Sequence, residues 1–120
     1  MIAIEKLRIA REILLQSFRT YINEVFLSEE HFTLKIIFQK GEQLFIRYND
    51  YQEYSYQFVF SSQIGDFLRY DNFDDRWNVK TRPHHLHGFD KVVVESKMNG
   101  DPHHDMPLLI KSVEKLLPKE

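Results

Sequence analysis

Apolar residues recur every three or four positions along the first part of the chain. This spacing is typical of a helix with one buried face, and it predicts a helix from about Ile4 to Phe26. The charged residues of the segment fall mainly on the other faces, and Ser28-Glu29-Glu30 marks its end. The apolar stripe consists of Leu7, Ala10, Leu14, Phe18, Tyr21, Ile22 and Val25.

The pattern then changes to short segments in which apolar and polar residues alternate, as they do in strands with one buried face. A further segment, Lys91 to Glu95, contains three consecutive valines, which favours a fifth and central strand. The connections are too short for crossover helices, so we expect an antiparallel meander. The four alternating segments are residues 32–38, 44–48, 54–60 and 67–70.

A second amphipathic helix is expected from about Met106 to Leu117. Asp105 suits the position that caps its first turn, and Pro107 suits that turn because proline needs no backbone donor there. The pattern therefore predicts a single α+β domain over residues 1–120, with both helices packed on one face of a sheet of about five strands.

Composition narrows the possible functions. The chain has no cysteine, which excludes disulfides, thiol catalysis and zinc sites built on cysteine. A formal net charge of −2 exerts no general attraction on nucleic acid, so such binding needs a local basic patch. No apolar run approaches the roughly 18 residues that span a bilayer, and no signal peptide is recognisable at the amino terminus. A cytoplasmic protein without membrane contact is expected.

The candidate chemistry lies between Asp71 and His87. Histidine titrates near neutral pH, so the group His84, His85 and His87 can supply acids, bases or metal ligands. On an extended backbone His85 and His87 share one side, and His84 points to the other. Asp71 ends the preceding strand, and antiparallel pairing would bring it close to the histidines.

One interpretation is a ribonuclease that works without metal. Two histidines would transfer the protons, with His84 as an orienting residue or a surface group. Arg69, Arg82 or Lys80 would stabilise the charge of the transition state. The segment from Arg76 to Gly88 has three cations and no acid, which makes it a local basic patch for single-stranded RNA. The candidate nucleic-acid contacts are Tyr70, Arg76, Trp77, Lys80 and Arg82.

A second interpretation is a divalent metal site. Asp71, His85 and His87 provide one carboxylate and two imidazoles, which suit zinc or manganese with one position left open. The pair His103-His104 reads as a polar turn before the last helix, with a further ligand as its alternative role. The dipeptide Asp71-Asn72 also has a purely structural explanation, because Asp and Asn side chains after a strand commonly hydrogen-bond to nearby backbone in a turn.

The arrangement Arg69-Tyr70-Asp71-Asn72 followed by Pro83-His84-His85-x-His87 resembles the TumE family of toxin–antitoxin proteins. The strand pattern Glu53-Tyr54-x-Tyr56-x-Phe58 adds to the resemblance, which covers about residues 44–95. Family members commonly continue Asp-Asn with Ala-Pro-His-His, whereas this chain continues with Phe73-Asp74-Asp75-Arg76-Trp77. One of two possible histidine clusters is therefore absent.

The resemblance implies a small prokaryotic toxin that is neutralised by a cognate antitoxin protein. Two functions remain open: a ribonuclease-like toxin, and a non-enzymatic metal- or partner-binding module that acts by protein contact. Aromatic residues from Tyr48 to Tyr56 are expected to form exposed strand edges, which favours binding of the antitoxin or of a second copy in a homodimer.

Overall fold

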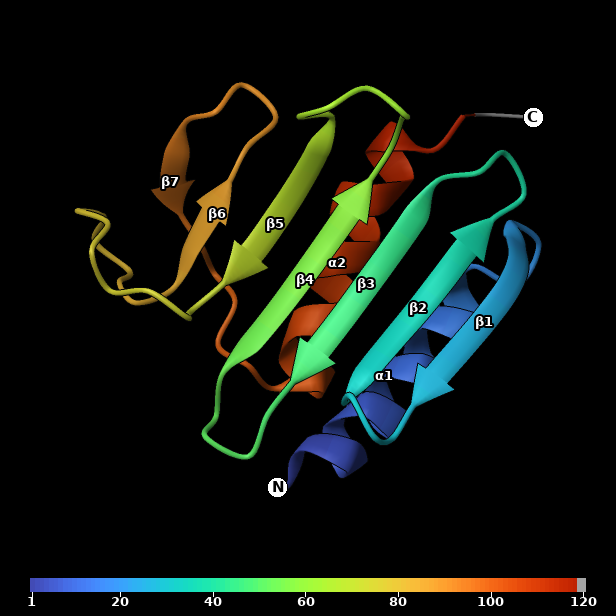
Figure 1. The fold of residues 1–120 in the computed structure, drawn as a ribbon, viewed down its shortest axis with the longest axis horizontal. Coiled ribbons are helices and arrows are strands. Elements are labelled where there is room, and N and C mark those ends of the chain that lie inside the picture. The colour runs from blue at the N-terminus through green and yellow to red at the C-terminus, as the bar shows by residue number, and fades with distance from the viewer. Residues whose placement is uncertain (119–120) are drawn as a thin grey trace.

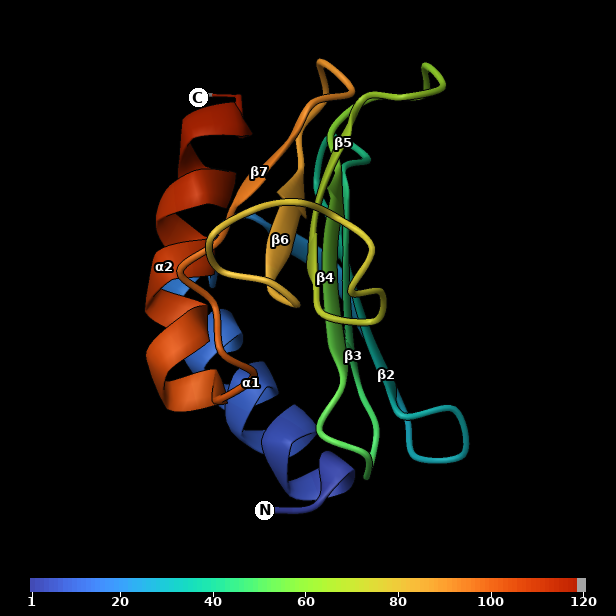
Figure 2. The same ribbon diagram turned by 90° about the vertical axis from the view of Figure 1, so that its left-hand side faces the viewer.

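The computed structural model describes residues 1–118. Over these residues, two helices lie against one face of a seven-stranded antiparallel sheet, and each strand pairs with the next in chain order (Figure 1). Figure 2 shows the two layers edge-on. The predicted α+β class is confirmed. The elements are α1 (Ala3–Ser17), β1 (Ile22–Ser28), β2 (Thr33–Phe38), β3 (Gln43–Tyr48), β4 (Tyr54–Val59), β5 (Phe67–Asp71), β6 (His85–His87), β7 (Val93–Glu95) and α2 (Pro102–Leu116).

The core lies between the sheet and the helices. Alternate residues of β2, β3 and β4 point toward the helices and are fully buried, whereas their neighbours point to the opposite side. Leu7 and Leu14 of α1 and Met106 and Val113 of α2 fill the space from the other layer. The opposite side, which we call the open face, has no helix over it and faces the reader in Figure 1.

The first predicted helix is too long: α1 ends at Ser17, and the last two residues of the predicted apolar stripe, Ile22 and Val25, belong to strand β1. A bulge explains the error. Ile22 pairs with Phe38, but Glu24 pairs with Ile37, so β1 contains one extra residue at this point. Ile22 and Val25 therefore both pack against the core at a spacing of three, which imitates the spacing of a helix.

The prediction that residues 91–95 form a central strand is also wrong. This segment contributes β7, a three-residue strand at the edge of the sheet, and Val94 is 42% exposed. The neighbour of β5 is instead β6, which contains the histidines. β-Branched residues favour a strand wherever it lies, so their presence does not report its place in the sheet.

The expected aromatic edge from Tyr48 to Tyr56 does not exist. β3 and β4 are inner strands, and Tyr48, Tyr54 and Tyr56 are buried. Only Tyr51, in the turn between them, is strongly exposed among the tyrosines of this segment. These aromatic residues hold the sheet to the helices and offer no edge to a partner.

Helix α2 begins four residues earlier than predicted. Its cap is Asp101, whose side chain accepts a hydrogen bond from the backbone N–H of His103, and Pro107 lies inside the helix. Asp105 is fully buried and accepts hydrogen bonds from the Tyr56 hydroxyl at 2.6 Å and the Gly100 N–H at 2.7 Å. Within residues 1–118, neither helix is long and apolar enough to cross a membrane.

We expect Asp105→Ala to lower the free energy of unfolding by more than about 3 kcal/mol, because it leaves several buried donors without an acceptor. Asp101→Ala is the control, since it removes an exposed helix cap and should cost about 1 kcal/mol. Urea denaturation measures both. Equal losses in the two variants would contradict a special role for the buried carboxylate.

Candidate functional site

Strand pairing aligns four polar residues in one row across the open face. Arg47 of β3 lies opposite Ser55 of β4, Ser55 lies opposite Asp71 of β5, and Asp71 lies opposite His85 of β6. Side chains directly opposite each other on one face of an antiparallel pair are in contact range. The row therefore places a carboxylate next to an imidazole.

A second row runs beside the first. Gln57 of β4 lies opposite Arg69 of β5, which in turn lies opposite His87 of β6. Arg69 and Asp71 are two residues apart on one strand, as are His87 and His85, so all four side chains project from the open face. The two rows bring together residues that are separated by up to forty positions in the chain.

Asp71, His85 and His87 form a compact group, which we call the trio. His85 Nε2 lies 3.0 Å from Asp71 Oδ1, and His87 Nε2 lies 3.8 Å from Asp71 Oδ2. The two imidazole rings meet edge to face, with their centroids 4.7 Å apart. His85 is 1% exposed and Asp71 is 5% exposed, so both lie almost entirely below the surface.

Neighbouring groups hold the trio in place. Arg69 Nε donates to Asp71 Oδ2 at 2.9 Å, and the backbone N–H of Phe73 donates to Asp71 Oδ1 at 3.3 Å. His85 Nδ1 lies 2.8 Å from the carbonyl oxygen of Pro83. A carbonyl can only accept, so Nδ1 is the protonated nitrogen and Nε2 is the one that faces Asp71.

The trio forms part of the wall of a cavity of about 400 Å³ on the open face. Three arginines line the cavity against two aspartates, which leaves one net positive charge when the histidines are neutral. Arg76 stacks on the Trp77 ring at 4.7 Å, and that ring contacts His87 with centroids 5.3 Å apart. The lining residues are Arg47, Ser55, Gln57, Arg69, Asp71, Phe73, Asp74, Arg76, Trp77, His85 and His87.

His87 favours its neutral form. Burial lowers the pKa of its imidazole below the usual 6.5, and the positive charge of Arg69 lowers it further, against the opposing effect of Asp71. At pH 7 the ring is therefore uncharged, with a nitrogen that can accept a proton or bind a metal ion.

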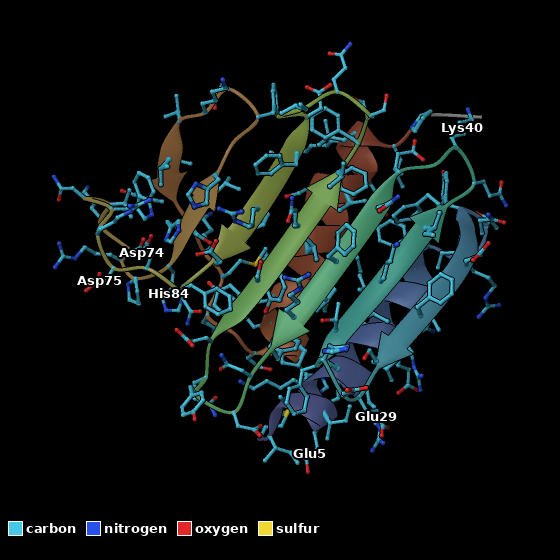
Figure 3. The ribbon with its side chains drawn as sticks, in the orientation of Figure 1. Glu5, Glu29, Lys40, Asp74, Asp75 and His84 are labelled. Atoms are coloured by element: carbon cyan, nitrogen blue, oxygen red, sulfur yellow. The ribbon has the colours of Figure 1, made fainter. Side chains whose placement is uncertain are left out.

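His84, a predicted catalytic residue, lies apart from the trio. Its Nδ1 is 2.9 Å from the Tyr54 hydroxyl, and the two rings stack on the helix side of the sheet. Figure 3 shows His84 at the same end of the molecule as Asp74 and Asp75. The predicted opposite orientations of His84 and His85 are present, and the contacts of His84 are those of a packing residue.

Three of the predicted nucleic-acid contacts do not line the cavity. The Tyr70 hydroxyl lies 2.8 Å from Ser112 of α2, on the helix side. Arg82 pairs with Asp75 at 3.3 Å, and Lys80 is exposed. Arg76 and Trp77 do line the cavity.

Asn72, next to Asp71, binds the end of β5 to the turn before β4 and to the first residue of β4. Its side-chain oxygen accepts from the backbone N–H of Tyr54 at 2.9 Å, and its side-chain nitrogen donates to the carbonyl of Gln52 at 3.1 Å. These bonds fix the end of β5 against the start of β4. The dipeptide Asp71-Asn72 therefore combines a site residue with a structural clamp.

Several lining residues were not predicted from the sequence, among them Arg47, Ser55 and Gln57. Alternation with buried neighbours already indicates that these side chains face away from the core. Only the strand register shows that they lie in line with Asp71 and Arg69. Phe73 and Asp74, which also line the cavity, belong to the loop after β5.

The trio is also the group of residues that meets the spacing of a metal site within residues 1–118. One ligand atom from each residue lies within 4.8 Å of the others. His103 and His104 do not belong to this group. His104 instead lies with its Nδ1 2.7 Å from Asp105, in the first turn of α2.

A comparison with protein families supports the resemblance noted in the sequence. The family model described as Toxin TumE matches residues 6–117, nearly the whole chain and much more than the motif region alone. No curated protein and no solved structure matches the chain.

The fluorescence of Trp77 should report the protonation of His87, because a protonated imidazole quenches an adjacent indole. In buffer with EDTA, we expect the emission to fall on acidification with a midpoint below pH 6.5, since the pKa of His87 is lowered. His87→Gln should remove most of this transition. A midpoint above pH 6.5 would show that the charge of Asp71 outweighs burial.

Proposed function

Because the chain belongs to the Toxin TumE family, we propose that it is a ribonuclease toxin whose cognate antitoxin protein keeps it inactive. The proposal rests on one observation: the trio of Asp71, His85 and His87 forms part of the wall of a cavity that three arginines also line. Arginines would bind the phosphate of the substrate, and the trio would activate the attacking hydroxyl.

The arginines differ in their availability to a substrate. Arg69 and Arg76 each pair with an aspartate at 2.9 Å. Arg47 is exposed, and no ion-pair partner for it is present in the described part of the chain. A guanidinium binds phosphate oxygens through paired hydrogen bonds, so Arg47 is the first candidate for holding the scissile phosphate.

The proposed reaction is an internal transesterification of RNA. The 2′-oxygen forms a bond to the adjacent phosphorus, and the bond from phosphorus to the 5′-oxygen breaks. The proton of the 2′-hydroxyl must leave, and the departing 5′-oxygen must gain a proton. The neutral imidazole of His87 can accept the first proton, and the imidazolium that forms can give a proton to the departing 5′-oxygen. A divalent ion held by the trio would instead supply Lewis-acid activation of the attacking oxygen.

Aromatic residues around the cavity suit a single-stranded substrate. Trp77 is half-buried beside His87, and Phe73 is 49% exposed at the rim. Unpaired bases stack on such side chains, whereas bases within a duplex are already stacked on each other. The requirement for a 2′-hydroxyl restricts the reaction to RNA.

His87→Ala should reduce the cleavage rate of single-stranded RNA by about 100-fold to 10⁴-fold, the range typical of a lost acid–base group. The measurement is the rate of fragment formation with purified protein. His103→Ala is the control, because this exposed histidine lies outside the cavity. Cleavage at the native rate by His87→Ala, or cleavage of the DNA analogue, would contradict the proposal.

Arg47→Ala should weaken the binding of RNA and raise KM, because it removes a phosphate ligand without disturbing the trio. We expect Arg47→Lys to recover part of the loss, since the charge returns without the paired donors. Growth inhibition by the expressed variants should follow the same order. If Arg47→Ala and Arg47→Lys both retain native KM and native toxicity, Arg47 does not bind the phosphate.

A further inference from the structure

The inner histidine of the trio contains a polar atom without a hydrogen-bond partner. His85 is 1% exposed, and its Nε2 makes no hydrogen bond within the described residues. Buried polar atoms are nearly always paired, and one that is not calls for an explanation such as a bound ion. Nε2 faces Asp71, and both residues form part of the wall of the cavity.

The geometry of this approach is unlike that of a hydrogen bond. Asp71 Oδ1 lies only 3.0 Å from Nε2, yet the contact does not meet the angular requirement of a hydrogen bond, so the oxygen lies to one side of the nitrogen's lone-pair axis. Nδ1 already uses the ring proton toward Pro83. In the neutral ring, Nε2 is thus an electron-pair donor that faces another one.

Two electron-pair donors this close together are stabilised by a cation that both can bind. Ligands of one tetrahedral ion at bond lengths of 2.0–2.1 Å are roughly 3.3 Å apart and lie off each other's axes. His85 Nε2 lies 3.0 Å from Asp71 Oδ1, and His87 Nε2 lies 3.8 Å from the other oxygen, Oδ2, so each imidazole is close to the carboxylate. One ligand atom from each of the three residues lies within 4.8 Å of the others, which is compact enough for one shared ion. A proton between the two groups would instead place the oxygen on the nitrogen's axis.

We propose that the trio of Asp71, His85 and His87 binds one divalent first-row transition-metal ion, for which Zn²⁺ is the test ion. Two imidazoles and one carboxylate favour such an ion over Mg²⁺, which prefers oxygen ligands. The contacts around the trio are those that orient metal ligands. His85 donates its one ring N–H, on Nδ1, to a carbonyl, and Asp71 accepts from Arg69 and from a backbone N–H.

Three protein ligands leave a fourth position, which would open toward the cavity. The arginines there would repel a bare cation, but they suit an ion whose fourth ligand is an anion. A phosphate oxygen at this position would contact the metal and lie near Arg47, Arg69 or Arg76. The binding of the ion by the trio does not depend on the proposed ribonuclease activity. Only the role of the ion in RNA cleavage rests on that proposed function.

The test is a calorimetric titration of the chelator-treated full chain with Zn²⁺ in the absence of RNA. We expect one ion per chain, no competition from Mg²⁺, and visible absorption bands of a low-coordinate site when Co²⁺ replaces Zn²⁺. Nitrogen NMR of the native protein should show shifts of the His85 and His87 rings on addition of Zn²⁺, while the ring of His103 stays unchanged. This measurement requires no variant to fold.

Variants then assign the ligands. Asp71→Asn and His87→Gln should weaken Zn²⁺ binding by at least about 10-fold, whereas His103→Gln, a matched change of an exposed histidine outside the site, should leave it unchanged. Circular dichroism confirms that each variant is folded. The absence of stoichiometric binding, ring shifts confined to other histidines, or equal weakening by His103→Gln would overturn the proposal.

The outcomes separate this inference from the proposed function. A chain that binds Zn²⁺ through the trio but cleaves no RNA retains the metal site and loses the ribonuclease assignment. A chain that cleaves RNA through His87 but binds no metal ion retains the ribonuclease and loses the metal site. Each proposal can therefore fail without the other.

Discussion

The pairing of β5 with β6 is the interaction on which the site depends. It sets Asp71 opposite His85 and Arg69 opposite His87. A shift of one residue in this register would turn both histidines toward the helices, because neighbouring residues of a strand point to opposite faces. β6 has only three residues, so its own hydrogen bonds contribute little. Additional restraint comes from the loop bonds at either side, including those of Asn72 and the bond from His85 to Pro83.

The two faces of the sheet differ in composition and in role. The helix side contains the apolar core together with a buried polar network, in which Tyr48, Tyr56 and Asp105 are hydrogen-bonded in a chain. Because that side provides the cohesion of the fold, the open face is free to hold charged side chains. The trio and the arginines occupy this face, which no helix covers (Figure 1).

The histidine motif contributes residues to both faces of the sheet. His85 and His87 face the cavity, while His84 packs on Tyr54 on the other side. The same division applies to Asp71, which faces His85, and Asn72, which clamps the neighbouring loop. A motif of adjacent reactive residues can therefore contain both site residues and structural residues, and strand alternation decides which is which.

The sequence by itself determined the α+β class, most of the strands and the grouping of Asp71 with the histidines, because alternation and helical periodicity are local properties of the chain. It misled at Ile22 and Val25, where a bulge imitates helical spacing, and at the valines of β7, whose composition does not encode an edge position. Only the tertiary structure brought Arg47, Ser55 and Gln57 into the site and moved His84 and Tyr70 out of it. The reason is physical: which strands are neighbours and in what register is decided by the joint burial of apolar faces from the whole chain, and no single segment contains that information.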